Sequence, residues 1–245
     1  MQYQMSRVVA GPLLRLLARP DVTGAEHIPV SGGAILASNH LSVVDSVYLP
    51  LMVDRPVTFA AKSEYFTGTR LRDRAVAAYL RATNQLSVDR AGARAAQEML
   101  AAALAMLRRG ELLGIYPEGT RSPDGRLYRG RTGIGWLALN SGVPVIPVAM
   151  IGTQQVLPPG HRVPRPGRIQ VRIGAPMTFG AYLDAPAGAR QRRAITDEVV
   201  RAIGKLSGQE FAPMYASVRK EELAAEAAAL AAAAPAGRRP GRQRP

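Results

Sequence analysis

Short apolar runs rich in β-branched residues alternate along this chain with longer stretches of helical periodicity. This alternation is typical of layered structures in which helices cover a mostly parallel or mixed sheet. We therefore expect an α/β fold with a central sheet flanked by helices. The expected strands are residues 34–38, 57–61, 85–88, 112–116, 145–150 and 169–173, and the expected helices are residues 43–53, 71–81, 93–109, 133–140, 191–206 and 221–234.

The 245 residues are enough for one substantial core with extensions at both ends. Residues 1–19 predict a short basic amphipathic helix, suited equally to lying on a membrane and to packing on the domain. Residues 20–210 hold the alternating pattern, and residues 211–234 predict a helical extension. Residues 235–245 are basic and rich in Pro and Gly, which predicts a disordered tail. No uncharged apolar run reaches about 18 residues, so we expect no membrane-spanning helix.

The composition excludes some chemistry but does not identify a partner. The formal net charge of +14 attracts anions such as nucleic acid, lipid headgroups or phosphorylated substrates. Only three of the 32 basic residues are lysines, so a compositional bias toward arginine explains the charge equally well. The absence of cysteine excludes disulfides, a thiolate nucleophile and thiolate ligands for zinc.

The sequence NHLSVVD at residues 39–45 follows the first of these strands, where open α/β sheets commonly place their sites. The carboxylate of Asp45 can hold one imidazole nitrogen of His40, so that the other nitrogen accepts a proton from a hydroxyl group. No G-x-S-x-G motif supplies a serine nucleophile. A substrate hydroxyl can take that place, which predicts direct transfer without a covalent enzyme intermediate.

The same segment also fits an ordinary helix start. Ser42 and Asp45 match a capping box, in which the Ser42 hydroxyl caps the helix. The two interpretations are compatible, because a helix N-terminus near His40 favours the neutral imidazole that a base requires. Three histidines and eight aspartates in 245 residues give about 0.1 such pairs by chance, so the pair is suggestive only.

A second motif, YPEGTRS at residues 116–122, follows another expected strand. Gly119 lets backbone amides approach a ligand closely, and the planar guanidinium of Arg121 suits a phosphate. Basic residues continue through the next loop to a helix N-terminus, which also attracts anions. A solvated surface turn would contain the same residue types, so the pattern leaves both interpretations open. The basic residues of this loop are Arg126, Arg129 and Arg131.

Other polar positions give weaker indications. Asp89, Arg90 and Lys62 each follow an expected strand, but each also fits an ordinary surface charge. His27 and His161 lie in proline-containing loops without an acidic cluster around them. We therefore expect no metal site.

Four segments together resemble, in order and spacing, the four sequence blocks of the glycerolipid acyltransferase family, which includes the bacterial 1-acylglycerol-3-phosphate acyltransferases. The resemblance covers about residues 20–180, and the combination of H-x4-D with E-G-T-R at this interval is specific. The second block departs from the family pattern, because NQLSV stands where glycine and aromatic residues are more usual. This departure leaves the acylated lipid open. The four segments are residues 39–45, 88–90, 118–122 and 143–148.

The resemblance implies that His40 is the general base on the acceptor hydroxyl and that Asp45 orients it. Arg131 looks like the family's basic residue in the loop after the E-G-T-R block. The segment 143–148 resembles the hydrophobic fourth block, expected as a strand bordering the acyl site. No cofactor or metal is implied, since acyl-CoA or acyl carrier protein is the donor substrate. The residues implied in holding the acceptor phosphate are Arg90, Glu118, Gly119, Thr120 and Arg121.

The reaction implied by the resemblance moves a fatty acyl group from a thioester to the free hydroxyl of 1-acylglycerol-3-phosphate, in phospholipid biosynthesis. The expected partners are the lysophospholipid, the acyl donor and an anionic membrane surface, with the protein in the cytoplasm at the inner face of the membrane. An acyltransferase for another lipid or glycolipid and an acyl-thioester hydrolase are close alternatives. A basic nucleic-acid-binding protein is a distant one, because only 5% of residues are aromatic and no helix-turn-helix pattern appears.

Overall fold

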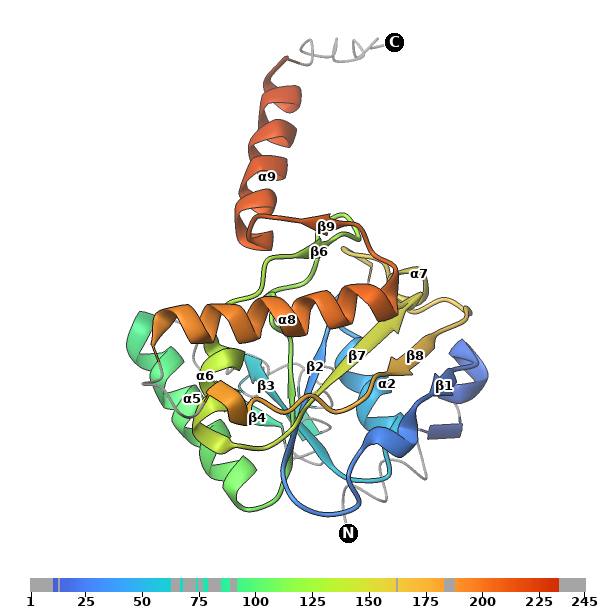
Figure 1. Ribbon diagram of the computed structural model, residues 1–245. Coiled ribbons are helices and arrows are strands. Elements are labelled where there is room, and N and C mark those ends of the chain that lie inside the picture. Colours follow the sequence, from blue (N-terminus) through green and yellow to red (C-terminus); the bar gives the residue numbers. More distant parts are fainter. Residues whose placement is uncertain are drawn as a thin grey trace, which may run out of the picture.

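A seven-stranded sheet forms the centre of the computed structural model, in the order β1-β8-β7-β2-β5-β3-β4 (Figure 1). The strands β7, β2, β5, β3 and β4 run parallel, whereas β8 is antiparallel to β7. The bounds are β1 Asp21–Thr23, β2 Ala34–Ser38, β3 Val57–Lys62, β4 Leu86–Val88, β5 Leu112–Ile115, β7 Val145–Ile151 and β8 Gln170–Ile173. The structure describes residues 11–12, 14–62, 67, 74, 77–78, 85–88, 92–161, 163–182 and 188–233.

Helices cover both faces of the sheet, and β2 shows how the sequence directs this packing. Alternate side chains of a strand point to opposite faces. Ala34 and Leu36 join the apolar cluster that includes helix α2, while Ile35 and Ala37 join the cluster formed with α5, α6 and α8. The central strand is therefore buried on both faces, as its uninterrupted apolar sequence predicts. The helices are α2 Asp45–Met52, α5 Gly92–Arg108, α6 Gly133–Ser141, α7 Thr153–Val156, α8 Ala189–Ser207 and α9 Ala216–Ala233, with 3-10 turns at Ala25–His27 and Gly180–Tyr182.

The expected α/β fold is confirmed, and the six expected strands are present with ends shifted by a residue at most. Three short strands were not expected: β1, β6 (Leu127–Tyr128) and β9 (Phe211–Ala212). The last of these corrects the expectation of a purely helical extension from residue 211, because β9 pairs with β6 before α9 begins. The helix expected at 71–81 lies mostly outside the described residues, as do residues 1–10 and the tail at 235–245.

The N-terminal segment packs on the domain at its inner end. Residues 14–18 are helical, Leu14 packs against the core cluster of α2, and Ala18 is fully buried in it. The Tyr48 hydroxyl donates a hydrogen bond of 3.0 Å to the carbonyl oxygen of Leu14. The Leu16 side chain points outward, with 74% of its surface exposed. None of the described helices is long and apolar enough to cross a bilayer.

Candidate active site

The two motifs meet at one edge of the sheet because they follow neighbouring parallel strands. Residue Leu36 of β2 lies beside Gly114 of β5 in the ladder, so both strands deliver their following loops to the same edge. The amide of Ser122 donates a hydrogen bond of 2.8 Å to the carbonyl oxygen of His40. The sequence motifs at residues 39–45 and 116–122 therefore form one site.

His40 and Asp45 form the pair that the sequence predicts. The Nδ1 atom of His40 lies 2.8 Å from Oδ2 of Asp45, whose side chain is fully buried. The same oxygen accepts the backbone amides of Leu41 at 2.7 Å and Ser42 at 2.8 Å. An oxygen that receives these bonds acts as an acceptor, so Nδ1 carries a proton, and in the neutral tautomer with this bond Nε2 is the nitrogen with the lone pair. The imidazole is therefore set up to accept a proton at Nε2.

The capping interpretation of this segment is only half right. Helix α2 begins at Asp45 after Val44, and no side chain caps it. The Ser42 hydroxyl instead donates a hydrogen bond of 2.8 Å to the carbonyl oxygen of Leu157. The Asp45 carboxylate does accept the Ser42 amide, as a capping box requires, but the helix starts too late for Ser42 to cap it. The carboxylate thus shapes the loop and holds the imidazole at once.

Tyr116, which the sequence analysis did not single out, fixes the plane of the imidazole. Its ring stacks on that of His40 with 3.9 Å between centroids and 8° between planes. The Phe59 ring also stacks on that of Tyr116, with 5.1 Å between centroids, and the Tyr116 hydroxyl lies 2.8 Å from the Ser46 hydroxyl. Burial and the nearby Asp45 carboxylate raise the pKa of Tyr116 well above its usual value, so its hydroxyl stays protonated. The sequence offers one indication of this role, because an aromatic residue stands at the end of an expected strand just before the E-G-T-R block.

The buried side chain of Glu118 links the two motif loops through hydrogen bonds. Only 1% of its surface is exposed, and its oxygens accept the amides of His40 at 3.2 Å and Tyr128 at 2.9 Å. Both interactions go to backbone, so the geometry suits positioning of the His40 loop better than contact with an anionic phosphate. Burial raises the pKa of Glu118 to about 7, although the two amide bonds oppose the shift.

Replacing Glu118 by Gln should change how stability depends on pH. The folded protein binds the Glu118 proton more tightly than the unfolded chain, so the wild type should lose stability as pH rises from about 4.5 to about 7. The loss is about 3 kcal/mol at most. Glu118→Gln has no such proton and should show a flatter curve. Urea unfolding of both proteins across this pH range measures the difference, and parallel curves would contradict the shift.

The loop at the rim of the site carries several of the predicted residues. Gly119 has a φ of 74°, a left-handed conformation that favours glycine, and the side chain of Arg131 lies against it. Arg121 is partly exposed and makes no hydrogen bond or ion pair to another described residue. Thr120 accepts a hydrogen bond from the ammonium of Lys220. Arg90 lies outside the described residues, and for Lys62 only the backbone is described.

An apolar cavity of about 340 Å³ has His40 in its wall. Its volume is that of a small ligand pocket. Gly114 permits the Phe59 ring to lie across β5, because a Cβ atom there would come within 2.3 Å of the ring. Gly119 and Arg131 also line the cavity, so its apolar interior adjoins the basic loop. The large apolar side chains in its wall are Phe59, Met99, Leu113, Ile115 and Ile134.

Residues 145–148 of the segment expected as a strand do form part of β7, but the segment does not line the described cavity. The lining of this cavity comes from β3, β5, α5, α6 and the loops after β2, β5 and β6, and none of the described lining residues lies on β7. β7 instead pairs with β2 inside the sheet. It supports the site through Asn39, whose amide group bonds both backbone groups of Met150, at 2.7 and 2.9 Å.

Comparison with known proteins decides the family. The family model described as Acyltransferase matches residues 19–151, which is more than half of the chain and includes both motifs. This protein belongs to the acyltransferase family. The crystal structure of the 1-acyl-sn-glycerophosphate acyltransferase PlsC from Thermotoga maritima is similar, with a TM-score of 0.64 and 28% sequence identity over 83% of this chain and 79% of that one. Family and structural neighbour agree with the α/β fold described above.

Named relatives within the acyltransferase family come from bacteria, plants and animals. A chloroplastic 1-acyl-sn-glycerol-3-phosphate acyltransferase of Brassica napus is 27% identical over 68% of this chain and 47% of its own length. An enzyme of the same name from Bacillus subtilis is 25% identical over 80% of this chain and 92% of its own length. The chain spans about half the length of the plant relatives it matches.

Proposed function

We propose that this protein transfers a fatty acyl group from a thioester to the free hydroxyl of a 1-acylglycerol-3-phosphate. The observation that carries the proposal is the His40–Asp45 pair in the wall of an apolar cavity, beside the loop of Gly119 and Arg131. An acyl chain suits the cavity and a phosphate suits the basic loop. The names of the matched relatives support the same acceptor.

In the proposed reaction, His40 acts as the general base. Nε2 takes the proton of the acceptor hydroxyl while the hydroxyl oxygen attacks the thioester carbonyl carbon, and the carbon–sulfur bond then breaks. Asp45 favours the imidazolium that forms, and Tyr116 keeps the ring in plane. A thiolate with a pKa of about 8.5 leaves readily, so the departing sulfur needs little acid assistance. Acyl-CoA and acyl carrier protein both supply such a thioester.

The acceptor phosphate is proposed to lie against the loop of residues 119–131. Arg121 is the first candidate, because it is partly exposed in the E-G-T-R loop and its side chain makes no bond to another described residue. Arg131 adjoins the cavity. Arg90 remains a candidate by family resemblance. Glu118 and Thr120 are proposed to act by holding the loop, since each bonds to a neighbouring segment.

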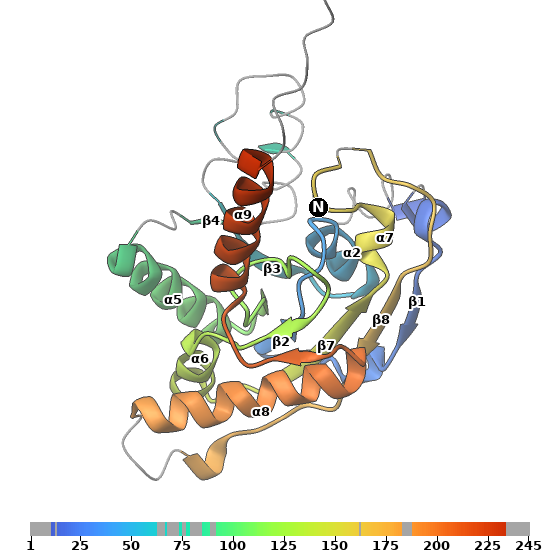
Figure 2. The same ribbon diagram turned by 90° about the horizontal axis from the view of Figure 1, so that it is seen from above.

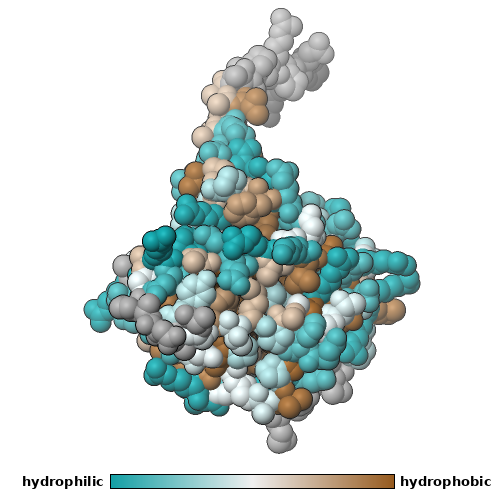
Figure 3. Space-filling view, viewed as in Figure 1, coloured by the Kyte–Doolittle hydropathy of each residue, from teal (hydrophilic) through white to brown (hydrophobic). Residues whose placement is uncertain are grey.

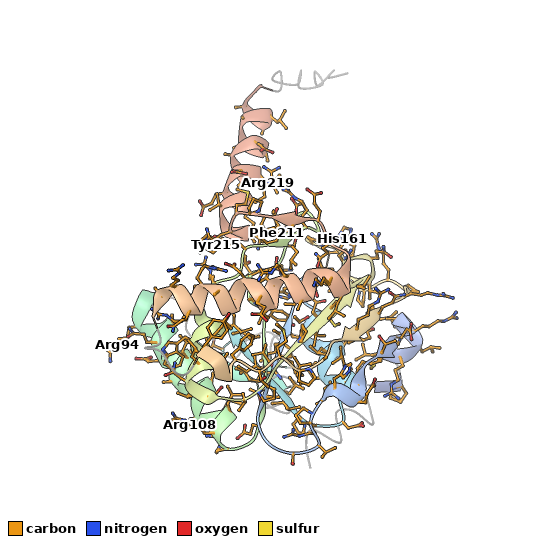
Figure 4. All side chains as sticks on the ribbon, in the orientation of Figure 1. Arg94, Arg108, His161, Phe211, Tyr215 and Arg219 are labelled. Carbon is orange, nitrogen blue, oxygen red and sulfur yellow. The ribbon has the colours of Figure 1, made fainter. Side chains whose placement is uncertain are left out.

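Arg121→Ala should raise the KM for the lysophospholipid by about tenfold and leave the KM for the acyl donor nearly unchanged, because an arginine–phosphate contact contributes to acceptor binding alone. Steady-state kinetics with each substrate varied in turn measure this. Arg94→Ala is the matched control, since Arg94 lies on the exposed face of α5, where its side chain is 92% exposed (Figure 4). If only the KM for the acyl donor changed, Arg121 would not bind the acceptor phosphate.

The proposed activity is tested with the purified protein and a panel of acceptors. Labelled acyl-CoA or acyl carrier protein is supplied with 1-acylglycerol-3-phosphate, other lysophospholipids, glycerol 3-phosphate or water alone. We expect a labelled diacyl product chiefly with 1-acylglycerol-3-phosphate. Free fatty acid in every tube would indicate a hydrolase, and label on another lysolipid would identify a different acceptor.

We propose further that the protein works at the cytoplasmic surface of an anionic membrane, where its lipid acceptor resides. The exposed Leu16 side chain beside Arg15 and Arg19 supports this, because such a pattern suits a membrane interface. Sedimentation with vesicles of anionic and of zwitterionic lipid tests the idea. Equal recovery in the supernatant with both kinds of vesicle would count against it.

A further inference from the structure

The C-terminal segment after α8 returns across the edge of the sheet where the site lies. β9 pairs with β6, with Phe211 beside Leu127 and Ala212 beside Tyr128. Figure 1 shows α9 rising from this edge above β6 and β9, and Figure 2 shows it from above, over the ends of the central strands. The family match ends at residue 151, so this segment lies outside it.

Gln209 ties the start of this segment to the loop that carries His40. Its carbonyl oxygen accepts a hydrogen bond of 2.7 Å from the side-chain amide of Asn39, the residue before His40. Its own amide donates to the carbonyl oxygen of Gly125 at 2.6 Å. The segment therefore contacts both motif loops at its first residues.

The ring of Tyr215 packs against two arginines of the basic loop. The guanidinium of Arg129 lies 5.5 Å from the ring centroid and that of Arg131 lies 5.3 Å from it. A nitrogen of Arg131 also donates to the Ser217 hydroxyl at 3.3 Å. Aromatic rings attract cations over their faces, so Tyr215 holds these two charges together at the rim of the cavity. Figure 4 shows Tyr215 at the foot of α9.

Lys220 brings a further cation to the E-G-T-R loop. Its ammonium donates to the Thr120 hydroxyl, and the side chain is half-buried. It is close enough to Glu118 to oppose the rise of that residue's pKa. The adjacent Arg219 differs, because it is paired with the carboxylates of Glu222 and Glu226, both at 3.0 Å. Figure 3 shows many hydrophilic side chains around the foot of α9, with apolar surface among them.

We propose that Lys220 is an acceptor-binding residue, which the C-terminal segment adds to the site by placing a cation beside Thr120. The hydrogen bond from its ammonium to the Thr120 hydroxyl holds this positive charge against the E-G-T-R loop, where it favours an anionic group. Lys220 contacts Thr120 and the Arg131 side chain lies beside Gly119, so both cations lie on the loop that also carries Arg121. The inference rests on the proposed function, since it names a further contact for the same phosphate.

Two substitutions at Lys220 test this inference. Lys220→Gln keeps a donor for Thr120 but removes the charge, and it should raise the KM for 1-acylglycerol-3-phosphate by about tenfold, with kcat and the donor KM changed by less than about twofold. Lys220→Arg keeps the charge and should restore the acceptor KM to within about threefold of the wild type. Lys205→Gln, at an exposed position of α8, is the matched control and should behave as the wild type.

The outcomes separate this inference from the proposed function. If the wild-type protein acylates no lysophospholipid, the proposed function itself is contradicted. An active wild type whose acceptor KM is unchanged by Lys220→Gln would overturn the Lys220 inference alone. Thermal unfolding of each variant checks for a structural effect, and a defect shared equally by Lys220→Gln and Lys220→Arg would also overturn it, because charge would then be irrelevant.

Discussion

His40→Ala should lower kcat by about 10² to 10⁴-fold while the protein keeps its fold, because the acceptor hydroxyl loses the base that removes its proton. The KM for each substrate should change far less, since the imidazole acts on the reacting proton and the cavity remains. Single-turnover and steady-state rates with saturating donor and acceptor measure the loss.

His161→Ala is the matched control for this prediction. His161 is exposed in the loop after α7, and among the described residues its ring contacts only the backbone carbonyl oxygen of Pro159, at 3.4 Å (Figure 4). Its replacement should leave kcat unchanged. If the His40→Ala protein has the circular dichroism spectrum and the turnover of the wild type, His40 is not the general base.

Asp45→Asn should also lower kcat by about 10² to 10⁴-fold, through the state of His40 rather than through substrate binding. Asp45 accepts the Nδ1 proton and two backbone amides through a single oxygen. An amide side chain cannot stabilise the imidazolium in the same way, and it can favour the wrong tautomer.

The control for Asp45→Asn is the same change at Asp21, an exposed aspartate of β1. It should leave kcat at the wild-type value. An imidazole nitrogen spectrum of His40 gives a second readout, because the wild type should carry its proton on Nδ1 at high pH. Unchanged turnover and an unchanged tautomer in Asp45→Asn would show that the pair has no catalytic role.

Much of the fold could be predicted from the sequence because the pattern is local. The apolar runs at residues 34–38 and 145–150 have no alternation, which is typical of strands buried on both faces, and both lie inside the sheet. Helix α9 begins at Ala216 rather than at the expected Glu221, because its first turns carry no hydrophobic periodicity to mark them. The two-residue strands β6 and β9 depend on each other across the chain, so neither has a local pattern.

The candidate site could be predicted to a similar degree. His40 and Asp45 lie five residues apart, so their contact is visible in the sequence, and the loop of Gly119 follows a neighbouring strand. Glu118 could not be assigned its buried position between two backbone amides from sequence alone. Gln209 and Lys220 reach the site from a segment far along the chain, and only the tertiary structure brings them to Asn39 and Thr120.

The most direct test of the central claim is the stoichiometry of the reaction. The protein is incubated with an acyl thioester and 1-acylglycerol-3-phosphate, and the free thiol, the diacyl product and the free fatty acid are measured together. Direct transfer through His40 predicts one diacylglycerol phosphate for each thiol released, with little free fatty acid. Release of thiol with matching free fatty acid, while the acceptor stays unacylated, would contradict the account.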